Sequence, residues 1–392
     1  MSLQKRFVIT VIAITTSFNL FSQEASSITD WVEEGKSLYE GISGKEKEHK
    51  NISIDLHLRA GFDLDMLDSK TSGKFNMREA RIDIKGNITN WLSFRYRQKL
   101  NDGNNSNGNM DNLPSSLDVL GVGIKFTDKW SAFIGKQAVS YGGFEYDLNP
   151  IMIYDYSETL LSLYGFMTGV NIIYNVNKSH EFQFQIVNSR MKSNINEAYG
   201  PGFKDISLPF IYTLNWNGNF NNTFLTRWSA SLMSQAKGKQ AYYYTMGNQL
   251  NIDKFSMYLD LNYYTKDIDD NGVITALTEG IDGRNALDVD YKGIVYQIDY
   301  RLTPKWNIFG RTSFDVTSVN KSHKDIEKGT YKTLFGYQTG VEYYPMQKSN
   351  LHFFLAYVGK YHKFKEKAKS FGADNYSENR VSVGFIYTLP VF

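Results

Sequence analysis

The sequence predicts an all-β fold, a transmembrane antiparallel β-barrel of about 16 strands with short periplasmic turns and long outer loops. Three observations predict it. Apolar and polar residues alternate along many segments, the connections between successive segments are alternately short and long, and tryptophans lie at the short connections. The overall composition, 42% hydrophobic with 15% aromatic residues, looks like that of a soluble protein. A membrane barrel has this appearance because each strand is apolar only at every second position.

The first 22 residues predict a cleaved signal peptide. Lys5 and Arg6 precede a mostly apolar stretch, residues 7–21, and the small residue Ser22 follows. A membrane-anchoring helix is the alternative, but the stretch contains Thr, Ser and Asn and is shorter than the roughly 20 residues of a span. The expected division is therefore a signal peptide (1–22), a polar periplasmic segment (23–50) and an outer-membrane barrel (51–392) in a Gram-negative bacterium.

Charge and cysteine content narrow the class of partner. Removing residues 1–22 removes two positive charges, so the net charge of +2 falls to about zero, which argues against nucleic acid as a partner. The chain has no cysteine, so no disulfide framework indicates its compartment.

The first predicted strand, NISIDLHLRAGFDLDM (51–66), shows the pattern most clearly. Every second residue from Ile52 to Met66 is apolar, and the residues between are Ser, Asp, His, Arg or Gly. Successive side chains of a strand point to opposite faces. Crossing roughly 30 Å of hydrocarbon takes about 9–11 strand residues, with more for the rims. The apolar face is expected to meet lipid and the charged face to meet water inside a closed cylinder, because an open sheet edge in lipid costs several kcal/mol per unpaired backbone group.

The same alternation recurs along the rest of the chain. The further predicted strands are 79–88, 91–100, 119–127, 130–137, 166–175, 181–188, 210–217, 224–236, 241–252, 255–265, 291–302, 306–316, 333–344, 351–359 and 380–389. An even number of strands places both ends of the barrel in the periplasm, and sixteen strands leave an aqueous channel.

Tryptophans mark the short connections. Trp91, Trp130, Trp216 and Trp306 all lie beside short turns. Trp and Tyr favour the membrane interface, so these residues predict an aromatic girdle at the periplasmic rim. Ordinary aromatic residues at strand ends of a soluble sheet are the alternative.

Two segments, FNMREARIDIKGNITNWLSFRYRQKLND and LGVGIKFTDKWSAFIGKQAVSYGGFEYDLNP, resemble early strands of the phosphate-selective porin O/P family. The resemblance is good over about residues 75–150 and only architectural elsewhere. It implies a sixteen-stranded homotrimer in the lipid bilayer that lets small polar or anionic solutes diffuse passively. The arginine ladder of the phosphate specialists does not map onto this chain residue by residue. The chain ends in the expected aromatic, Phe392, but Pro390 and Thr388 depart from the usual apolar alternation before it.

The second and third predicted strands place five basic residues on the lumen face. We call them the basic wall: Arg81, Lys85, Arg95, Arg97 and Lys99. Neighbouring strands lie under about 5 Å apart, so a wall of one sign would concentrate counter-ions. The alternative is that Asp55, Asp63 and Asp83 neutralise it. On later predicted strands of the barrel, acidic residues balance the arginines: Arg227, Arg301 and Arg311 against Asp260, Asp299, Asp315 and Glu342. We therefore expect at most a weak preference for anions.

The longest predicted connection, residues 138–165, is the third outer loop. It carries four acidic residues, Glu145, Asp147, Asp155 and Glu158. The family resemblance implies that this loop folds into the lumen and sets a constriction, where its carboxylates would face the basic wall across the channel. A loop that rests on the outer rim is the alternative.

Residues 267–279, DIDDNGVITALTE, match the start of a calcium loop. Asp267, Asp269 and Asn271 could bind Ca²⁺ weakly, although Thr278 occupies the twelfth position, where a bidentate Glu belongs. A hydrated outer loop without metal is the alternative, and no other cofactor is expected.

Two further classes of function remain open at this stage. A barrel could serve as an adhesin or assembly scaffold through its long loops, or as an outer-membrane enzyme. None of the six histidines lies in an HExxH motif or beside a G-x-S-x-G turn, so we do not expect an enzyme.

Overall fold

The computed structural model describes residues 37–43, 51–68, 70–102, 109–270, 272–279, 283–346 and 349–392. The predicted signal peptide lies outside the described residues, as do residues 23–36 and 44–50 of the predicted polar segment. Residues 38–43 of that segment form a short helix, α2 (Leu38–Ser43), whose Tyr39 N–H donates to the carbonyl of Val391 at 3.0 Å.

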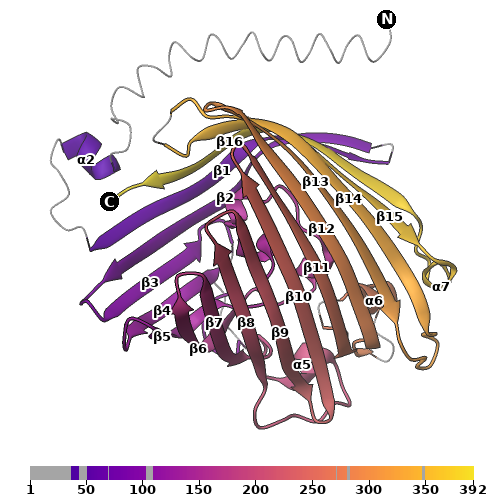
Figure 1. The fold of residues 1–392 in the computed structure, drawn as a ribbon. Helices are drawn as coiled ribbons and strands as arrows, with labels where there is room; N and C mark the ends of the chain where they lie inside the picture. Colours follow the sequence, from indigo (N-terminus) through magenta and orange to yellow (C-terminus); the bar gives the residue numbers. More distant parts are fainter. Residues whose placement is uncertain are drawn as a thin grey trace, which may run out of the picture.

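Sixteen antiparallel strands form one closed barrel, which confirms the predicted fold class (Figure 1). Their bounds are β1 (Ile52–Leu67), β2 (Lys70–Asn87), β3 (Leu92–Lys99), β4 (Leu117–Lys125), β5 (Trp130–Ala138), β6 (Phe166–Asn177), β7 (His180–Asn188), β8 (Phe210–Phe220), β9 (Phe224–Ala236), β10 (Lys239–Ile252), β11 (Phe255–Ile268), β12 (Leu287–Thr303), β13 (Trp306–Val319), β14 (Gly329–Tyr343), β15 (His352–Phe364) and β16 (Tyr376–Pro390). Each strand pairs with its neighbours in sequence, and β1 closes the ring by pairing with β16 from Asp55 opposite Pro390 to Leu67 opposite Glu378. Closure satisfies the backbone groups that an open edge would leave unpaired in lipid.

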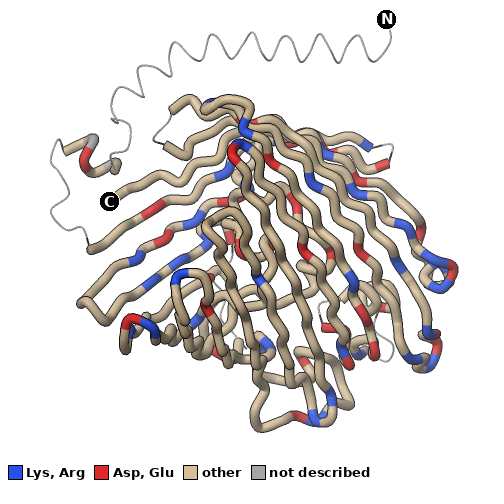
Figure 2. The backbone as a smooth tube through the Cα atoms, in the orientation of Figure 1, with Lys and Arg blue, Asp and Glu red and all other residues tan. Residues whose placement is uncertain are grey.

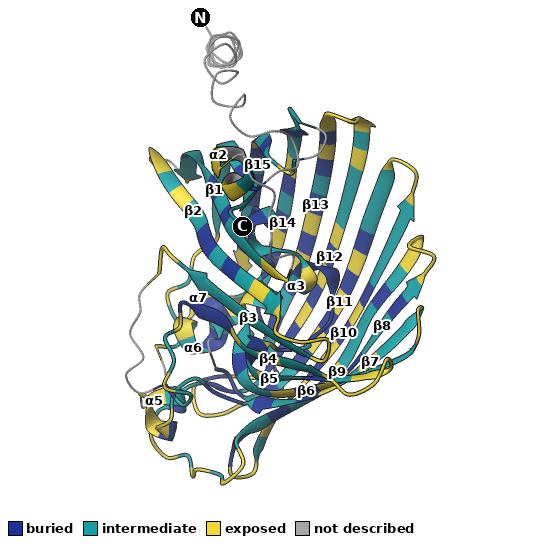
Figure 3. Ribbon diagram, turned by 90° about the vertical axis from the view of Figure 1, so that its left-hand side faces the viewer, coloured by how far each residue is buried: buried dark blue, intermediate teal, exposed yellow. Residues whose placement is uncertain are grey.

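The two faces of the barrel differ as the alternation predicts. Along β11, Asp260 and Asn262 are buried toward the lumen, whereas Leu259 and Leu261 are exposed on the outside. Figure 3 shows the resulting bands of buried and exposed residues along β11–β14. The apolar outer face suits contact with hydrocarbon. A polar side chain on this face would lose its hydrogen bonds to water, which costs free energy.

Two outer connections are shorter than predicted. The β1–β2 connection spans only residues 68–69, and the β9–β10 connection spans only residues 237–238. Asp68 (φ 49°) and Gly238 (φ 71°) take the left-handed conformation that tight hairpins use. The predicted strands leave residues 67–78 and 237–240 between them, whereas the strands of the structure extend further and leave only a tight turn in each place.

Six helical segments lie in the loops at the opposite end of the barrel from the C-terminus or inside it (Figure 1). They are α3 (Phe144–Asp147), a 3₁₀ turn η1 (Pro150–Met152), α4 (Glu158–Leu161), α5 (Ile195–Tyr199), α6 (Val273–Leu277) and α7 (Glu366–Lys369). Among the helices of the described ranges, none has the length and apolarity that crossing a membrane would require.

Aromatic residues line the rim where the short turns lie. Trp91, Trp130 and Trp306 are exposed beside the β2–β3, β4–β5 and β12–β13 turns. Trp216 packs edge to face with Trp228 at 5.1 Å near the β8–β9 turn. The predicted girdle thus coincides with the rim that carries the C-terminus.

Candidate pore constriction

The third outer loop, residues 139–165 and called L3 below, lies inside the barrel. Its first turn rests on β9 and β11, where the N–H of Gly143 donates to the carbonyl of Arg227 at 3.1 Å. The N–H groups of Phe144 and Glu145 both donate to the Asp260 carboxylate, at 2.9 and 2.8 Å. A lumen-facing carboxylate of β11 therefore fixes the point at which L3 turns into the channel.

L3 then bridges opposite walls of the barrel. The Asp147 carboxylate accepts from Arg227 on β9 at 2.6 Å, while Asn149, two residues later, lies 3.0 Å from His57 on β1. The tip returns along β13–β15, where the Tyr154 ring stacks on Phe309 at 4.8 Å and packs edge to face against Phe354. L3 therefore narrows the lumen by crossing it.

The four acidic residues of L3 bind cations of the wall formed by β9 and β13–β15. Glu145 pairs with Arg311, Asp147 with Arg227, Asp155 with Lys360 at 2.9 Å, and Glu158 with Lys332. The expected opposition between these carboxylates and the basic wall is therefore not the arrangement found. Each carboxylate meets a cation of another wall because L3 lies against that wall.

The basic wall is assembled on the lumen face as the register of β2 and β3 requires. Arg81 lies opposite Lys99, and Lys85 lies opposite Arg95, on neighbouring strands. In Figure 2, basic and acidic positions alternate along the second half of β2, whereas β3 carries basic positions and no acidic ones. Arg95 makes a two-point contact with Asp83, at 3.0 and 2.7 Å.

Carboxylates partly neutralise this wall. Lys85 lies 3.6 Å from Asp55, and Arg81 and Arg97 each lie 3.2 Å from Asp118. Lys99 lies 3.8 Å from Asp102 at the outer end. Asp63, expected to join this network, instead accepts from Arg78 at 2.7 Å.

The cations of the wall differ in their access to the channel. The side chains of Lys85 and Arg95 are 54% and 39% exposed, whereas the Asp83 carboxylate that faces Arg95 is 3% exposed. Arg81 and Arg97 are largely buried.

Burial raises the pKa of the Tyr156 phenol in L3 to about 12, although the positive charge of the nearby Arg81 opposes this shift. The phenol therefore stays neutral.

A second cationic group lies where β1 meets β16, and sequence reasoning missed it. Arg59 donates to the carbonyl of Ile153, and its guanidinium lies 4.6 Å from the centre of the Tyr154 ring. Arg380 donates to the carbonyl of Tyr154 at 2.7 Å. Within the described residues neither arginine has an ion-pair partner. The alternation put Arg59 on the lumen face, but nothing in the sequence pointed to a contact with a loop about a hundred residues away.

Apolar packing closes the outer mouth over much of the barrel. We call this cluster the mouth core. It joins the outer ends of lumen faces from β6 to β15 with residues of L3, α6 and α7: Val139, Tyr141, Met167, Val187, Ile211, Met233, Ala241, Tyr243, Tyr264, Ile274, Ala286, Val289, Tyr291, Val319, Ile326, Tyr331, Phe364 and Ala368. Lys266 is buried beside this cluster, paired with Asp270 at 3.0 Å and donating to the carbonyl of Ser162 at 2.6 Å.

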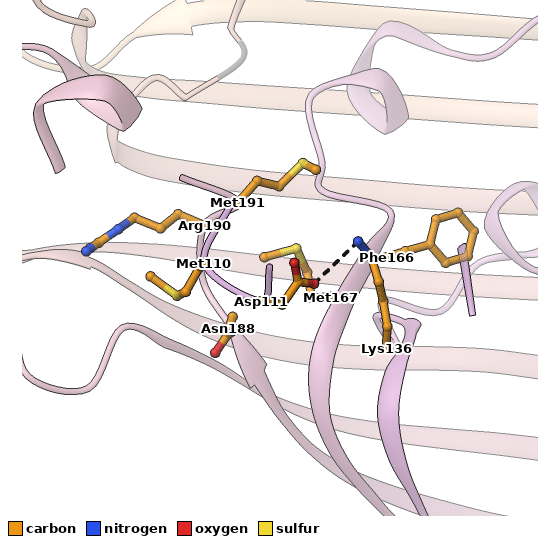
Figure 4. Close-up of a pocket in the computed structure, with 8 residues that line it drawn as sticks. All are labelled: Met110, Asp111, Lys136, Phe166, Met167, Asn188, Arg190 and Met191. Atoms are coloured by element: carbon orange, nitrogen blue, oxygen red, sulfur yellow. Dashed lines mark ion pairs between the residues drawn. The ribbon is translucent and has the colours of Figure 1, made fainter. Parts of the chain in front are cut away.

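A small cavity near the outer ends of β5–β7 has no room for a solute. Its volume is about 10 Å³, close to one water molecule. Figure 4 shows Asp111 and Lys136 forming an ion pair, 3.3 Å apart, in its lining. Asp111 also accepts from Thr168 at 2.8 Å, so this contact fastens the β3–β4 loop to the barrel.

The residues proposed for calcium are engaged by the protein where they are described. Asp267 accepts from the N–H of Gln240 at 2.8 Å, and Asp269 accepts from the N–H of Thr275 and the hydroxyl of Tyr291 at 2.8 and 2.6 Å. Asn271 lies outside the described residues. Across the ranges that the structure describes, no group of three or more His, Cys, Asp or Glu side chains is placed to hold a metal ion. Weak calcium binding stays a prediction.

Comparisons with known proteins agree with this geometry. The model of a family described as phosphate-selective porin O and P matches residues 52–389. No curated relative matches the chain in sequence. The fold is similar to that of in-vitro folded OmpT of Vibrio cholerae, with a TM-score of 0.57 at 12% identity, covering 88% of this chain and 100% of that one. It is also similar to the outer membrane channel DcaP of Acinetobacter baumannii (TM-score 0.57, 11% identity, 87% and 99% covered). A third similar structure is an anion-selective porin from Comamonas acidovorans (TM-score 0.57, 10% identity, 86% and 99% covered).

Proposed function

The chain belongs to the phosphate-selective porin O and P family and is an outer-membrane porin, and on this premise we propose that small hydrophilic solutes diffuse passively along its basic wall with a weak preference for anions. The family is one of channels, so selection rests on the width and charge of the path and needs no covalent chemistry. The mouth core lies along β6–β15, and L3 crosses the lumen from β9 to β1. We therefore place the path beside β2 and β3.

One observation carries the preference for anions. On the path, the side chains of Lys85 and Arg95 are 54% and 39% exposed, while the Asp83 carboxylate that pairs with Arg95 is nearly buried. A passing ion therefore meets the positive charge at closer range than the negative charge. The Asp147 carboxylate, 44% exposed and paired with Arg227, offsets part of this field, so the preference is weak.

A double neutralisation, Lys85→Gln with Arg95→Gln, tests the proposal. In planar lipid bilayers under a KCl gradient, we expect the reversal potential to shift toward potassium. The chloride-to-potassium permeability ratio should fall about threefold, because a unit charge a few ångströms from an ion in water contributes on the order of 1 kcal/mol.

The matched control is Lys254→Gln, an exposed lysine in the β10–β11 turn that lies away from the path. It should leave the ratio unchanged. An unchanged ratio in the double variant would overturn the anion preference but not the channel. Absence of any conductance in wild-type protein would overturn the channel itself.

Phosphate is a narrower candidate within the anions. If phosphate binds on the path, adding it should reduce chloride current in proportion to its occupancy. No reduction at millimolar phosphate would remove phosphate as a preferred solute while leaving the general anion preference intact.

We also infer a homotrimer that reaches the outer membrane after removal of residues 1–22. One similar barrel is the trimer form of in-vitro folded OmpT of Vibrio cholerae (TM-score 0.53, 12% identity), which supports the assembly by analogy of fold. Light scattering of the detergent-purified protein measures the assembly. N-terminal sequencing of exported protein measures the cleavage, and a chain that still begins at Met1 would contradict it.

A further inference from the structure

The outer surface of β10–β13 carries a concavity of about 350 Å³, the larger of the two cavities described here. Its lining combines three aromatic rings, one lysine and several aliphatic side chains: Tyr244, Met246, Leu261, Tyr263, Lys292, Ile294, Phe314 and Val316; Asn262 and Gly293 also contribute to it. The alternation of these strands points the first eight side chains away from the lumen. The concavity therefore faces the membrane and not the channel.

The register of the four strands arranges this lining in two rows. Tyr244 lies opposite Tyr263, which lies opposite Lys292. The next row toward the periplasm consists of Met246, Leu261, Ile294 and Phe314, each more than a third exposed. A cation with two tyrosines thus lies directly outside a wholly apolar row.

The depth of Lys292 corresponds to the outer headgroup region. Lys292 is eight residues from Tyr300, which is exposed at the periplasmic end of β12. Eight residues at about 3.4 Å each, tilted by roughly 40°, span about 20 Å along the membrane normal, close to the height of an apolar band of about 25 Å. The apolar row therefore lies at acyl-chain depth and Lys292 at its outer rim.

Lys292 has no carboxylate partner within the described residues. Its ammonium lies 5.6 Å from the centre of the Tyr263 ring. Asp290, two residues away on the same face, is buried and accepts from Asn320 and from the Tyr263 hydroxyl. An exposed ammonium at the edge of a hydrocarbon surface is stabilised by an anion from outside the protein, because unpaired charge is costly beside lipid.

We propose that this surface binds an anionic lipid of the outer leaflet, with its phosphate on Lys292 and an acyl chain along Met246, Leu261, Ile294 and Phe314. Ammonium and phosphate form a charge-assisted hydrogen bond, and Tyr244 and Tyr263 suit the boundary between headgroup and chain. The proposal rests on the orientation of the barrel in the membrane and is independent of the solute preference.

The test uses the whole porin in nanodiscs that contain equal parts of phosphatidylglycerol and phosphatidylcholine. Native mass spectrometry after release counts the lipids retained per chain. The wild type should retain phosphatidylglycerol over phosphatidylcholine, and Lys292→Gln should lower that retention at least threefold. Lys292→Arg should preserve it, because the charge remains.

Lys363→Gln is the matched control, since Lys363 is an exposed lysine on the outer face of β15, away from the concavity on β10–β13. It should retain as much phosphatidylglycerol as the wild type. Equal retention by Lys292→Gln, or equal retention of both lipids by the wild type, would overturn the proposal. A disulfide between two copies of a Lys292→Cys variant would also overturn it, because a second chain would then cover the surface. Heat-dependent gel mobility checks that every variant forms a barrel.

Discussion

At the scale of single residues, the ion pair between Glu145 and Arg311 joins L3 to the wall of the barrel. Both side chains are at most 2% exposed, and Glu145 also accepts from the N–H and the hydroxyl of Ser157, each at 2.7 Å. A buried pair of this kind depends on both partners, because removing one leaves the other charged and without water. Exposed pairs such as Asp147 with Arg227 are worth far less.

Glu145→Gln should therefore loosen L3 by about 3–5 kcal/mol. Hydrogen exchange of the L3 amides measures the loss of protection. Asp147→Asn, which breaks the more exposed pair, should cost about 1 kcal/mol or less. The double variant Glu145→Gln with Arg311→Met should recover most of the protection, since no buried charge is left alone. Wild-type protection in Glu145→Gln would refute the role of this pair.

At the scale of elements, the start of L3 depends on two glycines. Gly142 (φ 71°) and Gly143 (φ 83°) take a backbone conformation that favours glycine. A Cβ at Gly143 would lie 3.1 Å from the Thr245 methyl and 3.3 Å from the Asp260 carboxylate. The absence of a side chain lets the L3 backbone lie close against β10 and β11.

Gly143→Ala should displace the start of L3 and cost about 1–2 kcal/mol from the left-handed conformation alone. Single-channel conductance measures the displacement, and we expect it to differ from that of the wild type. Gly165→Ala, at the other end of L3, adds a methyl group where no atom lies within 4 Å, and its conductance should match the wild type. Equal conductance for all three proteins would show that the start of L3 does not set the channel width.

At the scale of the whole molecule, the barrel is only partly open. The mouth core seals the outer ends of β6–β15, and L3 crosses the lumen beneath it. The short strands β3–β5 lie outside most of this packing and adjoin the exposed cations Lys85 and Arg95. On the proposed path, passage is therefore confined to the side of the barrel that carries these cations.

Ile274→Asp should open the mouth core and raise conductance, because a carboxylate in this fully buried position of α6 carries a desolvation penalty of several kcal/mol. Ala276→Asp, on the exposed face of the same helix, should leave conductance unchanged. Planar-bilayer recordings measure both. An unaltered conductance in an intact Ile274→Asp barrel would mean that the mouth core does not limit passage.

The sequence alone determined the strands, their two faces, the periplasmic turns and the positions of the basic wall. These features follow from local rules: side chains alternate along a strand, and turn residues mark its ends. The alternation predicted Arg95 and Lys85 on one face, and the register set them opposite each other.

Only the tertiary structure decided which charges meet. Glu145 and Arg311 are 166 residues apart, and no periodicity links them. Asp118 joins Arg81 and Arg97 because a bulge in the pairing of β3 and β4, between Arg97 and Gln98, adds a residue to β4. The path of L3 and the mouth core depend on packing between strands that are distant in the sequence and meet only when the barrel closes. Local alternation of residues cannot predict these contacts.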